Sequence, residues 1–307
     1  MNWVVVGQGA MGLLWYHHLN QAKKTCGESD IYELSLLASK QQDLKQTHYQ
    51  FTSLDKQVSH GVVNYAKTKQ LQAADAVFLC LKSYQINNVI NQIASHLKEN
   101  CNIILAHNGM GTLEELPQAF IDRHTIYALL TTHGCLRNAS LNITHTGSGE
   151  SSIGLISGKH NSGKEKLTST LNKAFPPVIL EANITQKQWL KLSINCVINP
   201  ITALYDINNG SVNNTKFTKQ IERLLTEIIA IASTQGVILV KEKLRESVQQ
   251  VAQATAKNSS SMRCDVLAKR PTEIDYINGY IHRLGLRHAI ATPENTMMWQ
   301  AIKKLEI

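Results

Sequence analysis

The feature that most constrains the fold is a glycine pattern near the start of the chain. Residues Trp3 to Val6 form a short apolar run rich in valine, and GQGAMG follows at once, with glycines at positions 7, 9 and 12. A buried strand that turns into a helix through this spacing is typical of a dinucleotide-binding loop. The first glycine permits the turn, the second lets the backbone approach a pyrophosphate, and the third lets helix and strand pack closely. We therefore predict a cofactor site made by Gly7, Gln8, Gly9, Ala10, Met11 and Gly12.

The end of the second predicted strand bears on which dinucleotide fits. The strand over Ile31 to Leu37 should end near Ala38, where NAD-preferring proteins usually carry an Asp or Glu for the ribose hydroxyls. This chain has Ser39 and Lys40 there instead. A hydroxyl and a cation suit a 2′-phosphate, so we expect NADP, although Lys40 is equally compatible with an ordinary surface lysine.

The order of predicted elements indicates an α/β protein with two domains. Up to about residue 180, helical segments alternate with strand-like runs at Val4–Val6, Ser35–Leu37, Ala76–Leu81, Ile103–Ala106, Ile126–Leu130 and Ile153–Ile156. This alternation predicts a Rossmann-type, doubly wound parallel sheet.

After Pro176-Pro177 and a last short strand, Val178–Leu180, the periodicity becomes helical over residues 185–205, 215–236, 240–257 and 273–288. Thr292-Pro293 then opens a final helix. We expect an NADP-binding domain over residues 1–182 and an all-α substrate and catalytic domain over residues 183–307.

Composition narrows the class of partner. A chain of 307 residues with 43% hydrophobic content can build two cores. The net charge of +8 would permit nucleic-acid binding, but Lys and Arg are spread along the chain without a basic arm. We therefore expect small anionic ligands rather than nucleic acid.

No apolar run approaches the ~20 residues of a membrane helix. The first residues lead into a strand rather than a basic and then apolar signal segment. We expect a cytoplasmic protein that does not contact the membrane. The cysteines contain no C-x-x-C pair, so we predict no metal site and no disulfide framework, and mostly buried thiols. They are Cys26, Cys80, Cys101, Cys135, Cys196 and Cys264.

A polar stripe marks the first helix of the second domain. In WLKLSINCVINP, Lys191, Asn195 and Asn199 recur every fourth residue, which places them on one side of a helix. The apolar residues between them would cover a buried face. A solvated helix face explains such a stripe in many proteins, yet asparagine is a mediocre helix former. We therefore read the stripe as a candidate site for a small polar ligand.

Two predicted strand ends also carry polar side chains. AVFLCLK ends at Lys82, and NIILAHNGMG places Asn108 before Gly109 and Gly111. Ligands of open α/β sheets bind at the carboxyl ends of the strands. A lysine there is often a solvated loop residue, and asparagine suits a left-handed turn as well as a ligand, so both interpretations of these residues stay open.

Together these residues resemble the ketopantoate reductase (2-dehydropantoate 2-reductase) family. The resemblance runs from GQGAMG to PENT near the C-terminus. It includes Lys82, HNGMG at His107–Gly111, Thr131-Thr132-His133, KLSINCVINPITAL at Lys191–Leu204, Asn209-Gly210, NSSSM at Asn258–Met262 and TEIDYINGY at Thr272–Tyr280.

The resemblance implies NADPH-dependent reduction of 2-dehydropantoate to (R)-pantoate, on the route to pantothenate and coenzyme A. It implies that Lys191 donates a proton to the ketone oxygen and that Glu273 closes the site against cofactor and substrate. Lys82 and Asn108 match cofactor contacts, and Cys135 matches a backbone contact to the cofactor. The positions that match substrate contacts are Asn108, Lys191, Asn195, Asn199, Asn209 and Ser261.

The chemistry of these residue types agrees with that assignment. Hydride delivery to a ketone builds negative charge on oxygen, and a cationic donor stabilises that charge. Burial would lower the pKa of Lys191 toward efficient donation, while a carboxylate such as Glu273 would oppose excessive lowering. On the residues alone, Glu273 is equally a first-turn helix residue and Ser261 a loop hydroxyl. One departure concerns Ser39, where some family members have an arginine for the 2′-phosphate.

Two alternatives accompany this interpretation. One is a related NADP-dependent reductase of another 2-oxo acid. The other is a dinucleotide-sensing protein without chemistry, against which the presence of Lys191 and Glu273 argues. We expect a monomer or a homodimer.

Overall fold

The computed structural model describes residues 1–25, 30–38, 47–158 and 163–306. The chain divides into two units. Unit 1 comprises Met1–His107 and Glu115–Ile184, and unit 2 comprises Asn108–Glu114 and Thr185–Ile307. The segment Asn108–Glu114, which follows a strand of unit 1 in sequence, thus packs with the helical unit, a departure from the single boundary expected near residue 182.

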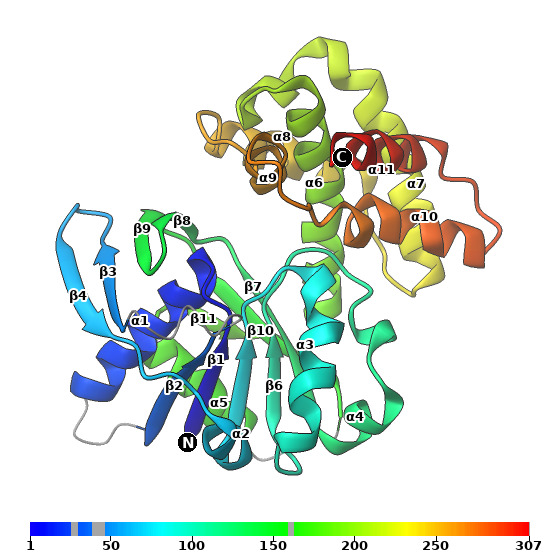
Figure 1. Cartoon of the computed structure of the whole chain (residues 1–307). Coiled ribbons are helices and arrows are strands. Elements are labelled where there is room, and N and C mark those ends of the chain that lie inside the picture. Colours follow the sequence, from blue (N-terminus) through cyan, green and yellow to red (C-terminus); the bar gives the residue numbers. More distant parts are fainter. Residues whose placement is uncertain (26–29, 39–46, 159–162, 307) are drawn as a thin grey trace. The chain divides into compact units, whose positions relative to one another are not determined.

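Unit 1 is built on a seven-stranded sheet (Figure 1). The strands lie in the order β11 (Val178–Leu180), β10 (Ser151–Ser157), β7 (Thr125–Thr131), β6 (Asn102–Leu105), β5 (Ala76–Leu79), β1 (Asn2–Val6) and β2 (Glu33–Leu37). All pairs are parallel except β7 with β10. The predicted doubly wound α/β sheet is confirmed, and the wholly parallel arrangement is corrected at this one pair.

The antiparallel pair has a simple cause. The chain between β7 and β10 forms β8 (Gly134–Ala139) and β9 (Asn142–Gly147) and contains no helix. A parallel return needs a crossover connection, usually a helix. Without one, β10 runs back along β7.

Helices cover both faces of the sheet. Adjacent residues of the central strands, such as Val77 and Phe78, are fully buried, as expected when each face is covered. On one face Phe78 meets Trp15, which also contacts Phe175. The helices of unit 1 are α1 (Ala10–Thr25), α2 (Thr68–Ala73), α3 (Ile86–Ile93), α4 (Gln118–Arg123) and α5 (Lys164–Ala174).

A second, four-stranded sheet lies against α1, and the sequence analysis missed it. Its order is β4 (Val58–Val62), β3 (His48–Thr52), β9 and β8. Tyr49 and Phe51 of β3 are buried, and Phe51 stacks on His17 of α1 with 3.9 Å between ring centroids. β3 alternates polar and apolar residues over only five positions, and β4, β8 and β9 carry few apolar residues, so the sequence signal of this sheet is weak.

Unit 2 is helical, as predicted. It contains α6 (Ile184–Tyr205), α7 (Thr218–Thr234), α8 (Lys241–Ala254), α9 (Ser261–Leu267), α10 (Asn278–Arg287) and α11 (Pro293–Leu305). The seven-residue α9 was not predicted. Among the described residues, no helix has both the length and the apolar character required to cross a membrane.

Pro200 lies inside α6 without ending the helix. Proline cannot donate to the carbonyl four residues earlier, which belongs to Cys196. Asn278 of α10 compensates, because its side-chain Nδ2 donates to that carbonyl at 3.0 Å and to Asn295 Oδ1 at 3.0 Å. These buried bonds fix α6, the helix that carries the polar stripe, to the core of unit 2.

Candidate active site

The glycine loop after β1 has the geometry of a phosphate-binding turn. Gly7 adopts φ +111°, and a Cβ there would lie 2.5 Å from the carbonyl oxygen of Cys80. A Cβ on Gly12 would lie 2.0 Å from the carbonyl oxygen of Gly7. By contrast, among the described residues nothing beyond its own chain neighbours lies within 4 Å of a Cβ built on Gly9. The fold itself requires the first and third glycines, whereas the second leaves open space beside the helix start.

That space faces the N-terminus of α1. The helix begins at Ala10, and the Leu13 amide donates to the Gly9 carbonyl at 3.0 Å. The first amide groups of a helix have no acceptor within it and bind anions readily. A loop with this shape fits a dinucleotide pyrophosphate.

Two residues that the sequence analysis missed support this loop. Gln8 Nε2 donates to the Tyr65 hydroxyl at 3.0 Å, and Arg137 Nη1 donates to the Gln8 carbonyl at 3.2 Å. Both partners are far from Gln8 in sequence and belong to segments without a recognisable motif, so no local signal identifies them.

The predicted NADP determinants, Ser39 and Lys40, lie outside the described residues. Lys82 precedes a short 3₁₀ turn, and its main-chain amide donates to Gln85 Oε1 at 3.2 Å. Cys135 lies on β8, where burial raises the pKa of its thiol to about 12. The thiol is therefore neutral near pH 7, which leaves the backbone as the group available for the predicted contact. The cofactor roles of all four residues stay predictions.

In unit 2, Asn108 and Glu273 meet. Asn108 Nδ2 donates to Glu273 Oε2 at 3.3 Å, although 165 positions separate the two residues. We call Asn108–Glu114 the strap. Its Met110 amide donates to the Tyr276 carbonyl at 2.8 Å, and a Cβ on Gly109 would lie 2.3 Å from the same oxygen. Glycine is required here both for φ +82° and for this close approach.

Glu273 also acts on Lys191. Glu273 is 4% exposed, so its carboxylate is nearly buried. Burial lowers the pKa of Lys191 from its ordinary value of 10.5 to about 8, and the charge of Glu273 opposes that lowering. The ammonium form therefore persists at neutral pH while the proton is held less tightly than in a solvated lysine.

The stripe on α6 has the predicted geometry. At 1.5 Å rise per residue, Asn195 and Asn199 follow Lys191 at intervals of about 6 Å along one side of the helix. Leu192 and Val197 lie in the hydrophobic core of unit 2. Asn199 is itself buried and Ile198 belongs to the same core, so the row borders the packed face. The ligand of the row stays a prediction.

Asn209 and Ser261 lie on neighbouring segments of unit 2. Asn209 Nδ2 donates to Thr255 Oγ1 at 3.0 Å, while its Oδ1 is buried with no hydrogen-bond partner among the described residues. Ser261 is exposed at the start of α9. The preceding Ser260 accepts a 2.7 Å bond from Thr202 of α6, which ties α9 to the helix of the stripe.

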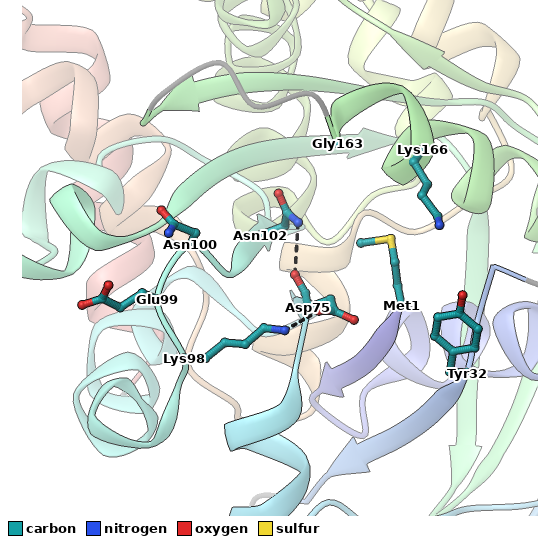
Figure 2. Close-up of a pocket in the computed structure, with 9 residues that line it drawn as sticks. All are labelled: Met1, Tyr32, Asp75, Lys98, Glu99, Asn100, Asn102, Gly163 and Lys166. Carbon is teal, nitrogen blue, oxygen red and sulfur yellow. Dashed lines mark hydrogen bonds and ion pairs between the residues drawn. The ribbon is translucent and has the colours of Figure 1, made fainter.

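A separate cavity of about 530 Å³ lies at the opposite end of the unit 1 sheet (Figure 2). It is lined by residues at the amino-terminal ends of β1, β5 and β6, where Lys98 pairs with Asp75. Its lining, taken over the described residues, includes none of the predicted site residues. Ligands of such sheets bind at the carboxyl ends, so this cavity is not the cofactor site.

The described cysteines are all free thiols. Cys80, Cys101 and Cys196 are buried, Cys135 is half-buried and Cys264 is exposed. Cys26 lies outside the described residues.

Comparison with known proteins shows which family this chain belongs to. The family model of the ketopantoate reductases PanE/ApbA matches residues 3–158, and the model of their C-terminal domain matches residues 183–306. The chain belongs to the ketopantoate reductase family. The resemblance drawn from the sequence motifs is thereby confirmed.

Relatives of this family match over the full chain. The 2-dehydropantoate 2-reductase of Vibrio cholerae is 34% identical over 306 residues, which cover 100% of this chain and 98% of that protein. A ketopantoate reductase structure from Ralstonia eutropha JMP134 has a TM-score of 0.85 at 22% identity, over 99% of this chain and 98% of that one.

A D-mandelate dehydrogenase solved with NADH and anilino(oxo)acetate has a TM-score of 0.87 at 20% identity, over 99% of this chain and 98% of that one. At these identities, both structures bear on the fold alone.

Proposed function

We propose that this protein reduces 2-dehydropantoate to (R)-pantoate with NADPH as the hydride source. The observation that carries the proposal is the environment of Lys191, whose pKa burial lowers to about 8 beside the nearly buried carboxylate of Glu273. Membership of the ketopantoate reductase family supports the substrate.

Lys191 is the proposed proton donor. NADPH, when bound, supplies the hydride to the ketone carbon. The Lys191 ammonium hydrogen-bonds the ketone oxygen, stabilises the negative charge that develops there, and transfers a proton from Nζ to that oxygen. Glu273 keeps the amine protonated and orients it. A pKa near 8 suits a general acid that works near neutral pH.

The amide groups beside Lys191 are proposed to hold the substrate. Asn195 and Asn199 do not titrate, so they offer hydrogen bonds that are independent of pH. The unpaired Oδ1 of Asn209 is an acceptor for a substrate hydroxyl, because burying an acceptor without a partner is costly. Ser261 is proposed as a donor to the substrate carboxylate. Such groups reject analogues that lack the matching hydroxyl.

The cofactor is proposed to lie on the glycine loop of unit 1. The open space at Gly9 supports this placement. The residues proposed to hold the dinucleotide are Gly7, Gln8, Gly9, Ala10, Met11, Gly12, Lys82, Asn108, Cys135 and Glu273. Ser39 and Lys40 are proposed to select NADP over NAD.

The proposal assigns cofactor binding to residues 1–182 and substrate binding with catalysis to residues 183–307. A cytoplasmic location and a monomer or homodimer stay predictions.

The test is the oxidation of NADPH with a panel of 2-oxo acids. Trimethylpyruvate differs from 2-dehydropantoate only in lacking the terminal hydroxyl, so it isolates the contribution of the side chains that bind this hydroxyl. We expect kcat/KM for 2-dehydropantoate to exceed that for trimethylpyruvate by about 100-fold or more. Equal values, or a higher value for another acid, would assign the enzyme to a different 2-oxo acid. Tight NADPH binding without turnover of any acid would indicate a sensing protein.

A further inference from the structure

The strap has a second attachment at its other end. Tyr280 of α10 donates its hydroxyl to Glu114 Oε1 at 2.8 Å. Both terminal nitrogens of Arg287, on the same helix, donate to Glu114 Oε2 at 3.1 Å. One carboxylate thus accepts three hydrogen bonds, two of them charge-assisted bonds from one exposed guanidinium to the same oxygen.

Tyr280 makes the attachment of Glu114 energetically important. The residue is 5% exposed, and a buried hydroxyl needs an acceptor. The centroid of its ring lies 6.2 Å from the ring centroid of Trp189 on α6, two residues before Lys191. The Glu114 anchor therefore contacts the core beside the helix that carries the proposed catalytic lysine.

Asn108 lies at the opposite end of the strap. Its Nδ2 donates to Glu273 Oε2 at 3.3 Å, a hydrogen bond whose length is sensitive to small displacements of the backbone. Gly109 and Gly111 both have positive φ values in the strap, and glycine offers little local stiffness of its own. The position of the Asn108 amide therefore depends on the contacts that hold the strap, among them the Met110–Tyr276 bond and the Glu114 anchor.

We propose that Glu114 is a positioning residue: its bonds to Tyr280 and Arg287 fix the strap so that the Asn108 amide stands against the Glu273 carboxylate. The inference rests on the proposed function, in which Asn108 and Glu273 serve the reaction. Glu114 acts through them and does not touch the reacting atoms. The path is continuous within unit 2, because Asn108 binds Glu273 and the charge of Glu273 acts on Lys191.

The kinetic test uses Glu114→Ala and Tyr280→Phe. Each removes the bond between the buried hydroxyl and the carboxylate, and we expect each to lower kcat/KM for 2-dehydropantoate by about three- to tenfold. Glu114→Gln keeps an acceptor for Tyr280 and should recover most of the loss. The control is Glu242→Ala on α8, which removes an exposed glutamate remote in sequence from the strap and should leave kcat/KM unchanged.

A double-mutant cycle separates positioning from general destabilisation. In the Asn108→Ala background, adding Glu114→Ala should cost less than about twofold further, because residues that act through one another are not additive. If the two losses multiply instead, Glu114 acts independently of Asn108 and the proposal is wrong.

Hydrogen exchange supplies a readout that needs no substrate. The Met110 amide, bound to Tyr276, should exchange at least about tenfold faster in Glu114→Ala than in wild type or Glu242→Ala. Unchanged protection overturns the inference whatever the kinetics. Faster exchange in a protein that does not reduce 2-dehydropantoate supports the anchoring of the strap and refutes the proposed function instead. Faster exchange with unchanged kcat/KM in an active enzyme overturns the positioning role.

Discussion

Replacing Glu273 by glutamine should move the alkaline limit of ketone reduction toward lower pH. Glu273→Gln keeps the size of the side chain and a carbonyl acceptor for Asn108 but removes the charge that raises the pKa of Lys191. An opposite charge at close range typically shifts a pKa by about 1–3 units. The pKa of Lys191, about 8 in the native protein, should therefore fall to about 5–7 in the variant.

The sign follows from the role of the lysine. Only the protonated amine donates to the ketone oxygen, so the rate of reduction falls as pH rises through the pKa of Lys191. At pH 8 about half of the native lysine carries the proton, whereas about a tenth or less would do so in the variant. The rate at pH 8 should drop at least about fivefold and recover as the pH is lowered.

The assay is kcat/KM for 2-dehydropantoate against pH at saturating NADPH, because kcat/KM reports the pKa values of the enzyme before the substrate binds. Glu294→Gln serves as the control, because Glu294 is also buried in unit 2 but pairs with Arg223. It should change the melting temperature without moving the alkaline limit. An alkaline limit that is unchanged in Glu273→Gln, or that moves upward, would refute the electrostatic role of Glu273.

Three further predictions follow from the geometry. Gly9→Ala should fold normally and bind NADPH more weakly. Gly12→Ala, whose Cβ would lie 2.0 Å from the Gly7 carbonyl oxygen, should bind NADPH more weakly and also melt at a lower temperature. Equal melting temperatures of the two variants would contradict this prediction. Asn199→Ala should raise the activation free energy that corresponds to kcat/KM by about 1–3 kcal/mol and change the free energy of unfolding less. A variant that melts early but keeps native kcat/KM would show that the stripe is structural.

Acid should destabilise unit 1, because burial lowers the pKa of five of its histidines below the ordinary 6.5. These histidines are neutral when folded and bind more protons when unfolded. Their contribution is therefore intact above pH 6.5 and is lost as the pH falls toward the pKa values of the folded protein, at no more than about 1.4 kcal/mol per pH unit for each proton that the unfolded chain takes up. A free energy of unfolding that does not change between pH 6.5 and pH 4 would refute this prediction. The residues are His17, His124 and His133 (pKa about 4), His18 (about 3) and His145 (lowered).

The sequence predicts those parts of the fold in which the pattern is local. Each strand of the main sheet is a short apolar run, and each long helix of unit 2 shows a 3.6-residue period, so both were predicted. The second sheet was not, because its strands bury only a few side chains among polar ones. The seven residues of α9 span about two turns, too few for periodicity to appear.

The candidate site divides in the same way. The glycine loop and the Lys191 stripe are readable because spacing alone places their residues together. The contact of Asn108 with Glu273 joins positions 165 residues apart, and only the resemblance to a family pointed to Glu273. Tyr280 belongs to the TEIDYINGY motif, which assigns it no role, and Arg287 has no signal in the sequence, since an arginine is not unusual on an amphipathic helix.

The most direct test of the account is the behaviour of Lys191→Ala in two measurements on the same preparation: the rate of NADPH oxidation after adding 2-dehydropantoate, and the Kd for NADPH. Loss of a general acid typically costs about 10²–10⁴-fold in rate. The account predicts a loss of that size in kcat with an essentially unchanged Kd, because the lysine serves the ketone oxygen and the glycine loop holds the cofactor. A variant with near-native kcat would contradict the central claim.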